Sequence, residues 1–199
     1  MKIGIIGFGS IGSYLAKQLG RDVAWVMDIS PQAATRFKSS GFKCAFHTSI
    51  PAKCGGADLV VEAASQKAVT HLVSCLQHCD IMIMSVGALA DDKVLAALLE
   101  TAKKHKRKIH IPSGAIGGTD AISAVDGKLE MIILETTKPP ASLGRNDSKR
   151  TAIFEGNARE ACRLYPQNVN VSATLSLAGI GFDKTIVRIV SDPAAKANT

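Results

Sequence analysis

The chain has 199 residues, of which 46% are hydrophobic and 21% are charged, and these ordinary globular proportions exclude general disorder. Its net charge is +7, from 24 basic and 17 acidic residues, which suits an anionic small molecule as well as nucleic acid. Because aromatic residues make up only 5% and no recognition motif is present, no nucleic-acid partner is expected.

The longest apolar run, residues 81–90, is far shorter than the ~20 residues of a membrane-spanning helix. The chain begins directly on a strand-like segment, without the pattern of a signal peptide. Its five cysteines lack the spacing of a disulfide framework, which agrees with a reducing compartment. We therefore expect a soluble, cytoplasmic protein that does not contact the membrane.

Apolar runs alternate with amphipathic stretches over the first part of the chain. Strands are expected at residues 2–6, 23–27, 58–62, 81–85 and 109–111, and helices at 13–19, after Pro31, at 66–79 and at 92–104. This alternation indicates a parallel sheet covered on both faces. Residues 1–112 are therefore predicted to form a dinucleotide-binding domain of the α/β class, a Rossmann-type doubly wound parallel sheet.

The pattern changes after Pro112, where residues 113–118 form a glycine-rich joint. Strands are expected at residues 131–137, around Ile153 and at 185–190, and helices at 157–164 and 171–177. Residues 113–199 are therefore predicted to form a second, α+β catalytic domain. No obvious closing element follows its last strand, so we expect this domain to be incomplete, with an ordinary frayed terminus as the alternative.

A glycine-rich turn lies between the first strand and the first helix. Gly7, Gly9 and Gly12 fit the pattern G-x-G-x-x-G, which in this context is typical of dinucleotide binding. Gly7 allows a tight turn, Gly9 lets the backbone approach a pyrophosphate, and Gly12 lets the helix pack closely on the strand. The phosphates would lie at the positive end of the helix dipole. A plain strand-to-helix turn is the alternative.

Asp28 ends the second predicted strand, where an acidic residue would bind the adenosine ribose. Its carboxylate can accept both ribose hydroxyls and would repel a 2′-phosphate, so NAD is favoured as cofactor over NADP, which stays possible. Arg36, further along, could soften this preference. A turn aspartate ahead of Ser30 and Pro31 is the alternative interpretation.

Small residues follow the later strands, at the edge of the sheet where the cofactor is expected. They are Ala63, Ala64 and Ser65, then Ser85 to Ala88, then Ser113 to Ala115. A flat cofactor passing close to these ends would require small side chains. Tight helix packing would require them equally.

A metal site is a weaker hypothesis. His71, Cys75 and Cys79 would share one face of a helix at four-residue spacing, but a zinc site needs a fourth ligand or a water position. Small buried thiols are the simpler interpretation, so no metal is expected.

Several longer motifs carry a resemblance to a known family. They are Pro112 to Gly118, Lys138 to Pro140, Phe154 to Ala161, Leu164 to Val171, Ala178 to Phe182, and Asp192 to Ala194. Through them the chain resembles the L-aspartate dehydrogenases over essentially its whole length.

The resemblance implies NAD(P)-dependent oxidative deamination of L-aspartate. Hydride would pass from Cα to the nicotinamide, and the resulting iminoaspartate would hydrolyse to oxaloacetate and ammonia or feed NAD biosynthesis. The small-molecule substrate is thus L-aspartate or oxaloacetate, and a homo-oligomer is expected. A non-catalytic NAD-binding protein or redox sensor, and a related amino-acid or semialdehyde dehydrogenase, stay as alternatives.

The resemblance also implies site residues. By this carry-over Ser10, Ile11 and Asp28 contact the cofactor, and Ala115 and Asn170 lie near its nicotinamide half. Asn170 has an alternative role, as the N-cap of a helix that begins at Val171.

A doubly charged substrate needs cations, and Lys138 is a candidate, although a solvated surface lysine is an equal alternative. His110, inside a strand, is interpreted as a packed or edge histidine.

The family's proposed acid/base histidine would follow Asn198 and Thr199, and neither it nor the family's closing strands and last helix are in this chain. No catalytic residue is therefore assigned. We expect the 199-residue chain to bind NAD(H) but to oxidise aspartate slowly or not at all.

Overall fold

The computed structural model describes residues 1–125, 127–166 and 169–197. Gln167 and Asn168, from the motifs above, and Asn198 and Thr199, which precede the expected position of the family's histidine, thus lie outside the described residues. The chain divides into two compact units, Met1–Pro112 and Ser113–Thr199.

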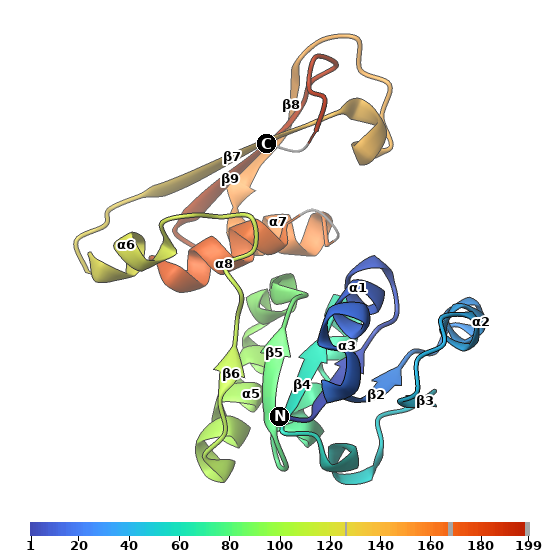
Figure 1. Cartoon of the computed structure of the whole chain (residues 1–199). Coiled ribbons are helices and arrows are strands. Elements are labelled where there is room, and N and C mark those ends of the chain that lie inside the picture. Colours follow the sequence, from blue (N-terminus) through green and yellow to red (C-terminus); the bar gives the residue numbers. More distant parts are fainter. Residues whose placement is uncertain (126, 167–168, 198–199) are drawn as a thin grey trace. The chain divides into compact units, whose positions relative to one another are not determined.

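The first unit is built on a six-stranded sheet in the order β3-β2-β1-β4-β5-β6 (Figure 1). Its strands are β1 (Ile3–Ile6), β2 (Val23–Met27), β3 (Ala45–His47), β4 (Leu59–Glu62), β5 (Asp80–Ile83) and β6 (Ile109–His110). All neighbouring pairs are parallel. Every residue of β1 is buried, so both faces of the sheet are covered. The predicted Rossmann-type fold is confirmed.

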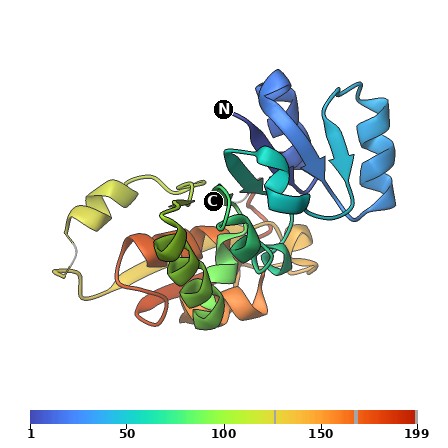
Figure 2. The ribbon, with the colours of Figure 1, turned by 90° about the horizontal axis from the view of Figure 1, so that it is seen from below.

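Five helices accompany this sheet, and they are α1 (Ser10–Leu19), α2 (Pro31–Ser39), α3 (Gln66–Val69), α4 (Leu72–Cys75) and α5 (Asp92–His105). The start of α2 follows from its sequence, because the Ser30 hydroxyl accepts a hydrogen bond from the Ala33 N–H and Pro31 fits the first turn. The helix α2 lies at the β3 edge of the sheet (Figure 2), where the Phe37 ring is 5.0 Å from that of Phe46.

Two expectations for this unit are wrong. The short edge strand β3 is not predicted, and the expected helix over residues 66–79 is instead the pair α3 and α4. At the junction the backbone hydrogen bonds reach back three residues instead of four: the His71 N–H donates to the Ala68 carbonyl at 3.1 Å, and the Ser74 N–H donates to the His71 carbonyl at 3.3 Å. This is the tighter pattern of a 3₁₀ turn, which interrupts an α-helix.

The second unit contains a three-stranded sheet in the order β7-β9-β8. The strands are β7 (Ile132–Lys138), β8 (Thr151–Asn157) and β9 (Thr185–Ser191), and the helices are α6 (Thr119–Ala124), α7 (Ala158–Leu164) and α8 (Asn170–Ala178). The pair β7 and β9 is parallel, while β8 and β9 are antiparallel. This mixed sheet and its helices confirm the predicted α+β fold of the second unit. The helix α6 is not among the elements predicted from the sequence.

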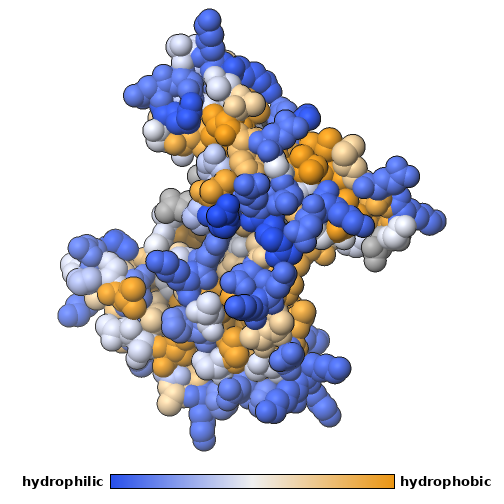
Figure 3. Space-filling view, turned by 180° about the vertical axis from the view of Figure 1, so that it is seen from behind, coloured by the Kyte–Doolittle hydropathy of each residue, from blue (hydrophilic) through white to orange (hydrophobic). Residues whose placement is uncertain are grey.

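No helix in the described ranges combines the length and apolarity needed to span a membrane. Figure 3 shows hydrophilic side chains distributed over the visible surface of both units, interspersed with smaller hydrophobic patches.

Candidate cofactor and substrate sites

The glycine-rich turn joins β1 to α1 in a conformation that requires glycine at two of its three glycine positions. Gly7 has a φ of +96°, and a Cβ at Gly7 would lie 2.6 Å from the Ala63 carbonyl oxygen. A Cβ at Gly12 would collide with the Gly7 carbonyl oxygen. At Gly9, by contrast, an added Cβ would meet no atom within 4 Å. The backbone at Gly9 therefore borders open space into which a ligand can fit.

The start of α1 offers donors to such a ligand. Gly9 is the N-cap residue and has no side chain to cap the helix, so the N–H groups of its first turn have no side-chain acceptor among the described residues. Ser10 and Ile11 are exposed there, Ile11 by 50%. Exposed N–H groups at the positive end of a helix suit a phosphate.

Asp28 follows β2 and holds the glycine-rich turn. Its Oδ2 accepts a hydrogen bond from the Phe8 N–H at 2.7 Å, and its Oδ1 accepts one from the Ser30 N–H at 2.8 Å. Arg36 Nη2 donates to the Phe8 carbonyl at 3.0 Å. The carboxylate is partly exposed and each oxygen keeps a second lone pair, so it can accept further hydrogen bonds. Its role in the turn adds to the expected contact with the cofactor.

Glu62, the last residue of β4, is a completely buried carboxylate that sequence reasoning missed. Its Oε1 accepts hydrogen bonds from the Ala64 and Ser65 N–H groups at 2.7 and 2.9 Å. The Ser85 N–H donates to Oε2 at 3.0 Å, and the Ser85 hydroxyl donates to Oε1 at 2.9 Å. Four donors thus satisfy the buried charge. An acid that ends an otherwise apolar strand is the sequence signal that could have found it.

Glu62 brings together two of the predicted strand ends. Ala63 and Ala64 follow β4, while Ser85 follows β5, and the hydrogen bonds of Glu62 connect both segments. Ala64 is exposed and Ala63 half-buried, whereas Ser85 is 9% exposed. The hydrogen bonds of Glu62 therefore join the ends of β4 and β5 at the carboxyl edge of the sheet, where Ala64 is exposed and Ser85 is buried.

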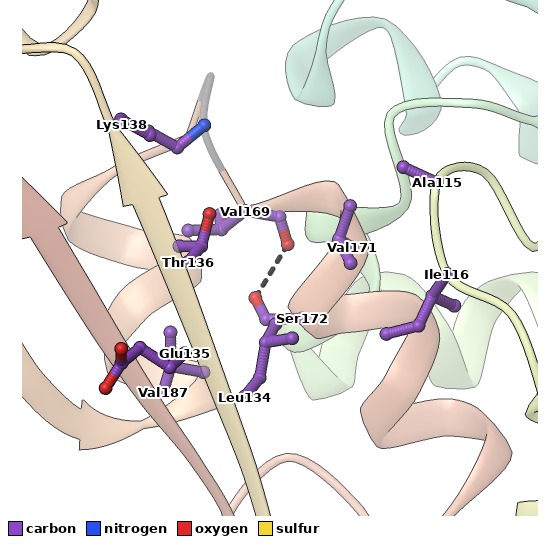
Figure 4. Close-up of a pocket in the computed structure, with 10 residues that line it drawn as sticks. All are labelled: Ala115, Ile116, Leu134, Glu135, Thr136, Lys138, Val169, Val171, Ser172 and Val187. Carbon is purple, nitrogen blue, oxygen red and sulfur yellow. Dashed lines mark hydrogen bonds between the residues drawn. The ribbon is translucent and has the colours of Figure 1, made fainter. Parts of the chain in front are cut away.

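A cavity of about 250 Å³ lies within the second unit (Figure 4). Its polar lining consists of Glu135, Thr136 and Lys138 from β7 and Ser172 from α8. Lys138 is only 6% exposed, and burial lowers the pKa of its ammonium group. The alternative of a solvated surface lysine is therefore wrong.

The residues expected near the nicotinamide lie at this cavity or beside it. Ala115 lines it, and so do Val169 and Val171 on either side of Asn170. Asn170 is the first residue of α8 and Val169 is its N-cap, so the alternative role of Asn170 as the N-cap is wrong.

The three residues considered as metal ligands differ in solvent exposure. His71 is exposed and immediately precedes α4, whereas Cys75 and Cys79 are buried. The hydrogen bond to Cys75 is the main cause that raises the pKa of the Cys54 thiol to about 12. Across the described ranges no group of three or more His, Cys, Asp or Glu side chains could hold a metal ion.

His110 is exposed on the edge strand β6, with Nε2 4.0 Å from Asp80 Oδ2. It is thus an edge histidine.

Each of the two units matches a known protein family. Residues 7–112 match the family model described as homoserine dehydrogenase, NAD binding domain, and residues 120–199 match the model described as aspartate dehydrogenase, C-terminal. The L-aspartate dehydrogenase of Methanosarcina acetivorans is 37% identical, over 100% of this chain and 81% of that protein. The chain belongs to the L-aspartate dehydrogenase family. The resemblance found in the sequence is confirmed.

Other members of the family agree. The L-aspartate dehydrogenase of Methanocaldococcus jannaschii is 41% identical over 100% of this chain and 80% of its own length. The crystal structure of aspartate dehydrogenase from Thermotoga maritima superposes with a TM-score of 0.82 at 32% identity, covering 100% of this chain and 81% of that one. The family is one of oxidoreductases, and the match to an NAD-binding domain confirms the expected NAD(P) cofactor.

Proposed function

We propose that the reaction of this protein is the NAD(P)-dependent oxidative deamination of L-aspartate, with the slow turnover by the 199-residue chain that its sequence leads us to expect. The observation that carries the proposal is the family match over the whole chain, which joins an NAD-binding fold to the family's C-terminal region. NAD(P)⁺, when bound, would supply the hydride acceptor for the reaction. Aspartate would lose a hydride from Cα and a proton from its amino group, and addition of water to the resulting imine would give oxaloacetate and ammonia.

The glycine-rich turn fits the cofactor's pyrophosphate. The open space at Gly9 and the uncapped first turn of α1 support this role. We assign Gly7, Gly9, Ser10, Ile11 and Gly12 to the pyrophosphate end.

Asp28 is assigned to the adenosine ribose, where its partly exposed carboxylate would accept the ribose hydroxyls and repel a 2′-phosphate. This favours NAD. Arg36 lies within the same hydrogen-bonded turn, and its positive charge would reduce the discrimination against NADP.

The small residues at the strand ends are assigned to the middle of the cofactor and to its nicotinamide half. The side chains of Ala63, Ala64 and Ser85 are small, so the backbone at the carboxyl end of the first sheet is accessible to a flat ligand. Ala115 and Asn170 are assigned to the nicotinamide half, since Ala115 lines the cavity of the second unit and Asn170 lies beside it.

We also propose a cellular location, an oligomeric state and a use of the product for this protein. Five free cysteines support a reducing, cytoplasmic location. Exposed Met131 and Ile133, the latter on the edge strand β7, support a homo-oligomer, which light scattering would test. The imine product could also feed NAD biosynthesis.

The test is to mix the protein with NAD or NADP and L-aspartate and to follow NADH or NADPH absorbance. L-homoserine is the matched comparison, because the NAD-binding unit matches a model described for homoserine dehydrogenase. Reduced cofactor with aspartate alone supports the proposal. Cofactor binding without turnover of either amino acid would favour the non-catalytic alternative, and turnover of homoserine alone would favour the related dehydrogenase.

A further inference from the structure

Lys138 is a buried cation without a counter-ion in the described part of the chain. Its side chain is 6% exposed, and the nearby acids are engaged elsewhere. Glu135 Oε1 accepts from Arg150 at 2.8 Å, and Asp192 Oδ2 lies 3.7 Å from another nitrogen of the same guanidinium group. An unpaired buried ammonium group destabilises a fold. Its presence therefore calls for a functional reason.

The backbone of Lys138 is firmly fixed. It is the last residue of β7, opposite Ser191 of β9, and its carbonyl accepts a hydrogen bond from the Asp192 N–H at 2.9 Å. The side chains of Lys138 and Thr136 extend from β7 on the side where Val169 lies (Figure 4). Lys138 therefore contributes its charge to the cavity from a rigid strand.

A second feature of the same cavity favours anions. The helix α8 has nine residues, and its N-cap residue, Val169, has an apolar side chain that makes no capping hydrogen bond. The cavity is lined by Val169, Val171 and Ser172 from this end of the helix. The positive end of a helix dipole and a buried ammonium group together stabilise negative charge.

We propose that the ammonium group of Lys138 binds one carboxylate of a dicarboxylic substrate in this cavity. The inference rests on the proposed function, which supplies a substrate with two carboxylates. A bound carboxylate would give the buried cation the partner that the described residues do not provide, through a charge-assisted hydrogen bond. Lys138 would thus contribute to the selection of aspartate over amino acids with apolar side chains.

The test titrates the NADH-loaded protein with succinate by calorimetry. Succinate carries two carboxylates and no reactive amine, so binding is measured without turnover. Replacing Lys138 with Met should weaken succinate binding about 10- to 100-fold, the worth of a hydrogen bond between charged groups. Lys138→Arg should retain part of the affinity. Lys184→Met, which removes the same charge at an exposed position of the same unit, should leave affinity unchanged.

Two further measurements separate this role from a structural one. Lys138→Met should melt at or above the temperature of the unmodified chain, because it removes an unpaired buried charge. It should bind NADH normally. Lower stability with unchanged succinate affinity would overturn the inference. An equal loss of NADH affinity would assign the lysine to a cofactor phosphate and would also overturn it.

Failure of the inference is distinguishable from failure of the proposed function. If the unmodified chain binds NADH and oxidises aspartate but Lys138→Met binds succinate equally well, only the carboxylate assignment is wrong. If the unmodified chain loaded with NADH does not bind succinate, the cavity is not the dicarboxylate site. If it does not bind NADH at all, the proposed function fails, and this inference fails with it.

Discussion

Asp28 fixes the glycine-rich turn from within and also presents a carboxylate toward the proposed ribose. It accepts hydrogen bonds from the Phe8 and Ser30 N–H groups at 2.7 and 2.8 Å. Replacing it with Ala should lower NAD affinity about 10- to 100-fold, because a charge-assisted pair is lost. The preference for NAD over NADP should narrow as well. Fluorescence titration of both reduced cofactors measures the two effects.

The control for Asp28 is Asp22→Ala, which removes an acid from an exposed position in the same unit. It changes the net charge equally without touching the turn. NAD affinity and discrimination that stay the same in Asp28→Ala would refute the ribose assignment.

Glu62 organises the carboxyl ends of β4 and β5. In Glu62→Gln an amide N–H₂ group replaces one carboxylate oxygen and faces N–H donors that have lost their acceptor. The variant should lose about 1–3 kcal/mol of unfolding free energy, measured as the urea midpoint at constant m-value. It should also bind NADH more weakly, because Ala64 and Ser85 would shift.

Ser85→Ala is a milder variant whose loss of stability can be compared with that of Glu62→Gln. It removes only the hydroxyl bond at 2.9 Å and keeps the backbone N–H bond at 3.0 Å. Its loss of stability should therefore be smaller than that of Glu62→Gln. A Glu62→Gln variant as stable as the unmodified chain would show that the four donors do not depend on the charge.

At the scale of elements, hydrophobic pattern decides what the sequence can predict. It predicts β2 over its full length and α5 to within one residue of its end, because both have strong apolar periodicity and clear boundaries. The strand β3 has only three residues, none of them fully buried, and pairs with β2 alone. Its existence depends on tertiary pairing rather than on local pattern.

Buried charges are the part of the site that a linear pattern does not reveal. Glu62 and Lys138 are 0% and 6% exposed, yet charged residues are usually solvated, so sequence alone favours exposure for both. Their burial follows from which strands become neighbours. The glycine spacing, by contrast, is a local constraint that a sequence displays directly.

The turn between β1 and α1 gives a prediction that separates folding from binding. Gly9→Val should fold normally, since a Cβ at this position meets no atom within 4 Å and such substitutions usually change stability by no more than ~0.5 kcal/mol. Its side chain would fill the path of the pyrophosphate, so NADH binding should be lost. Circular dichroism and NADH titration on one sample measure both.

Gly12→Ala is the matched variant within the same turn. Its Cβ would collide with the Gly7 carbonyl oxygen, so stability should fall by about 1–3 kcal/mol, as for an overpacked core. Normal NADH binding by Gly9→Val would remove the phosphate assignment. Equal stability losses in the two variants would contradict the different surroundings of the two glycines.

At the scale of the whole molecule, the two units have different proposed functions. The first unit has its own core, in which Ile5, Trp25 and Leu98 are at most 2% exposed. It also holds the glycine-rich turn and Asp28. The second unit holds the cavity with Ala115 and Lys138. Adenosine and pyrophosphate recognition would then belong to the first unit, and dicarboxylate recognition to the second.

A chain of residues 1–112 alone should therefore fold and bind NADH, but more weakly than the full chain. Its length is in the usual range of an independent domain, and its sheet is complete within those residues. Affinity should fall because Ala115 and Asn170, assigned to the nicotinamide half, are absent. Asp28→Ala should weaken NADH binding in the fragment by the same factor as in the full chain, and succinate should have no effect on the fragment. Thermal melting and NADH titration check these outcomes, and a folded fragment that does not bind NADH would show that cofactor binding requires both units.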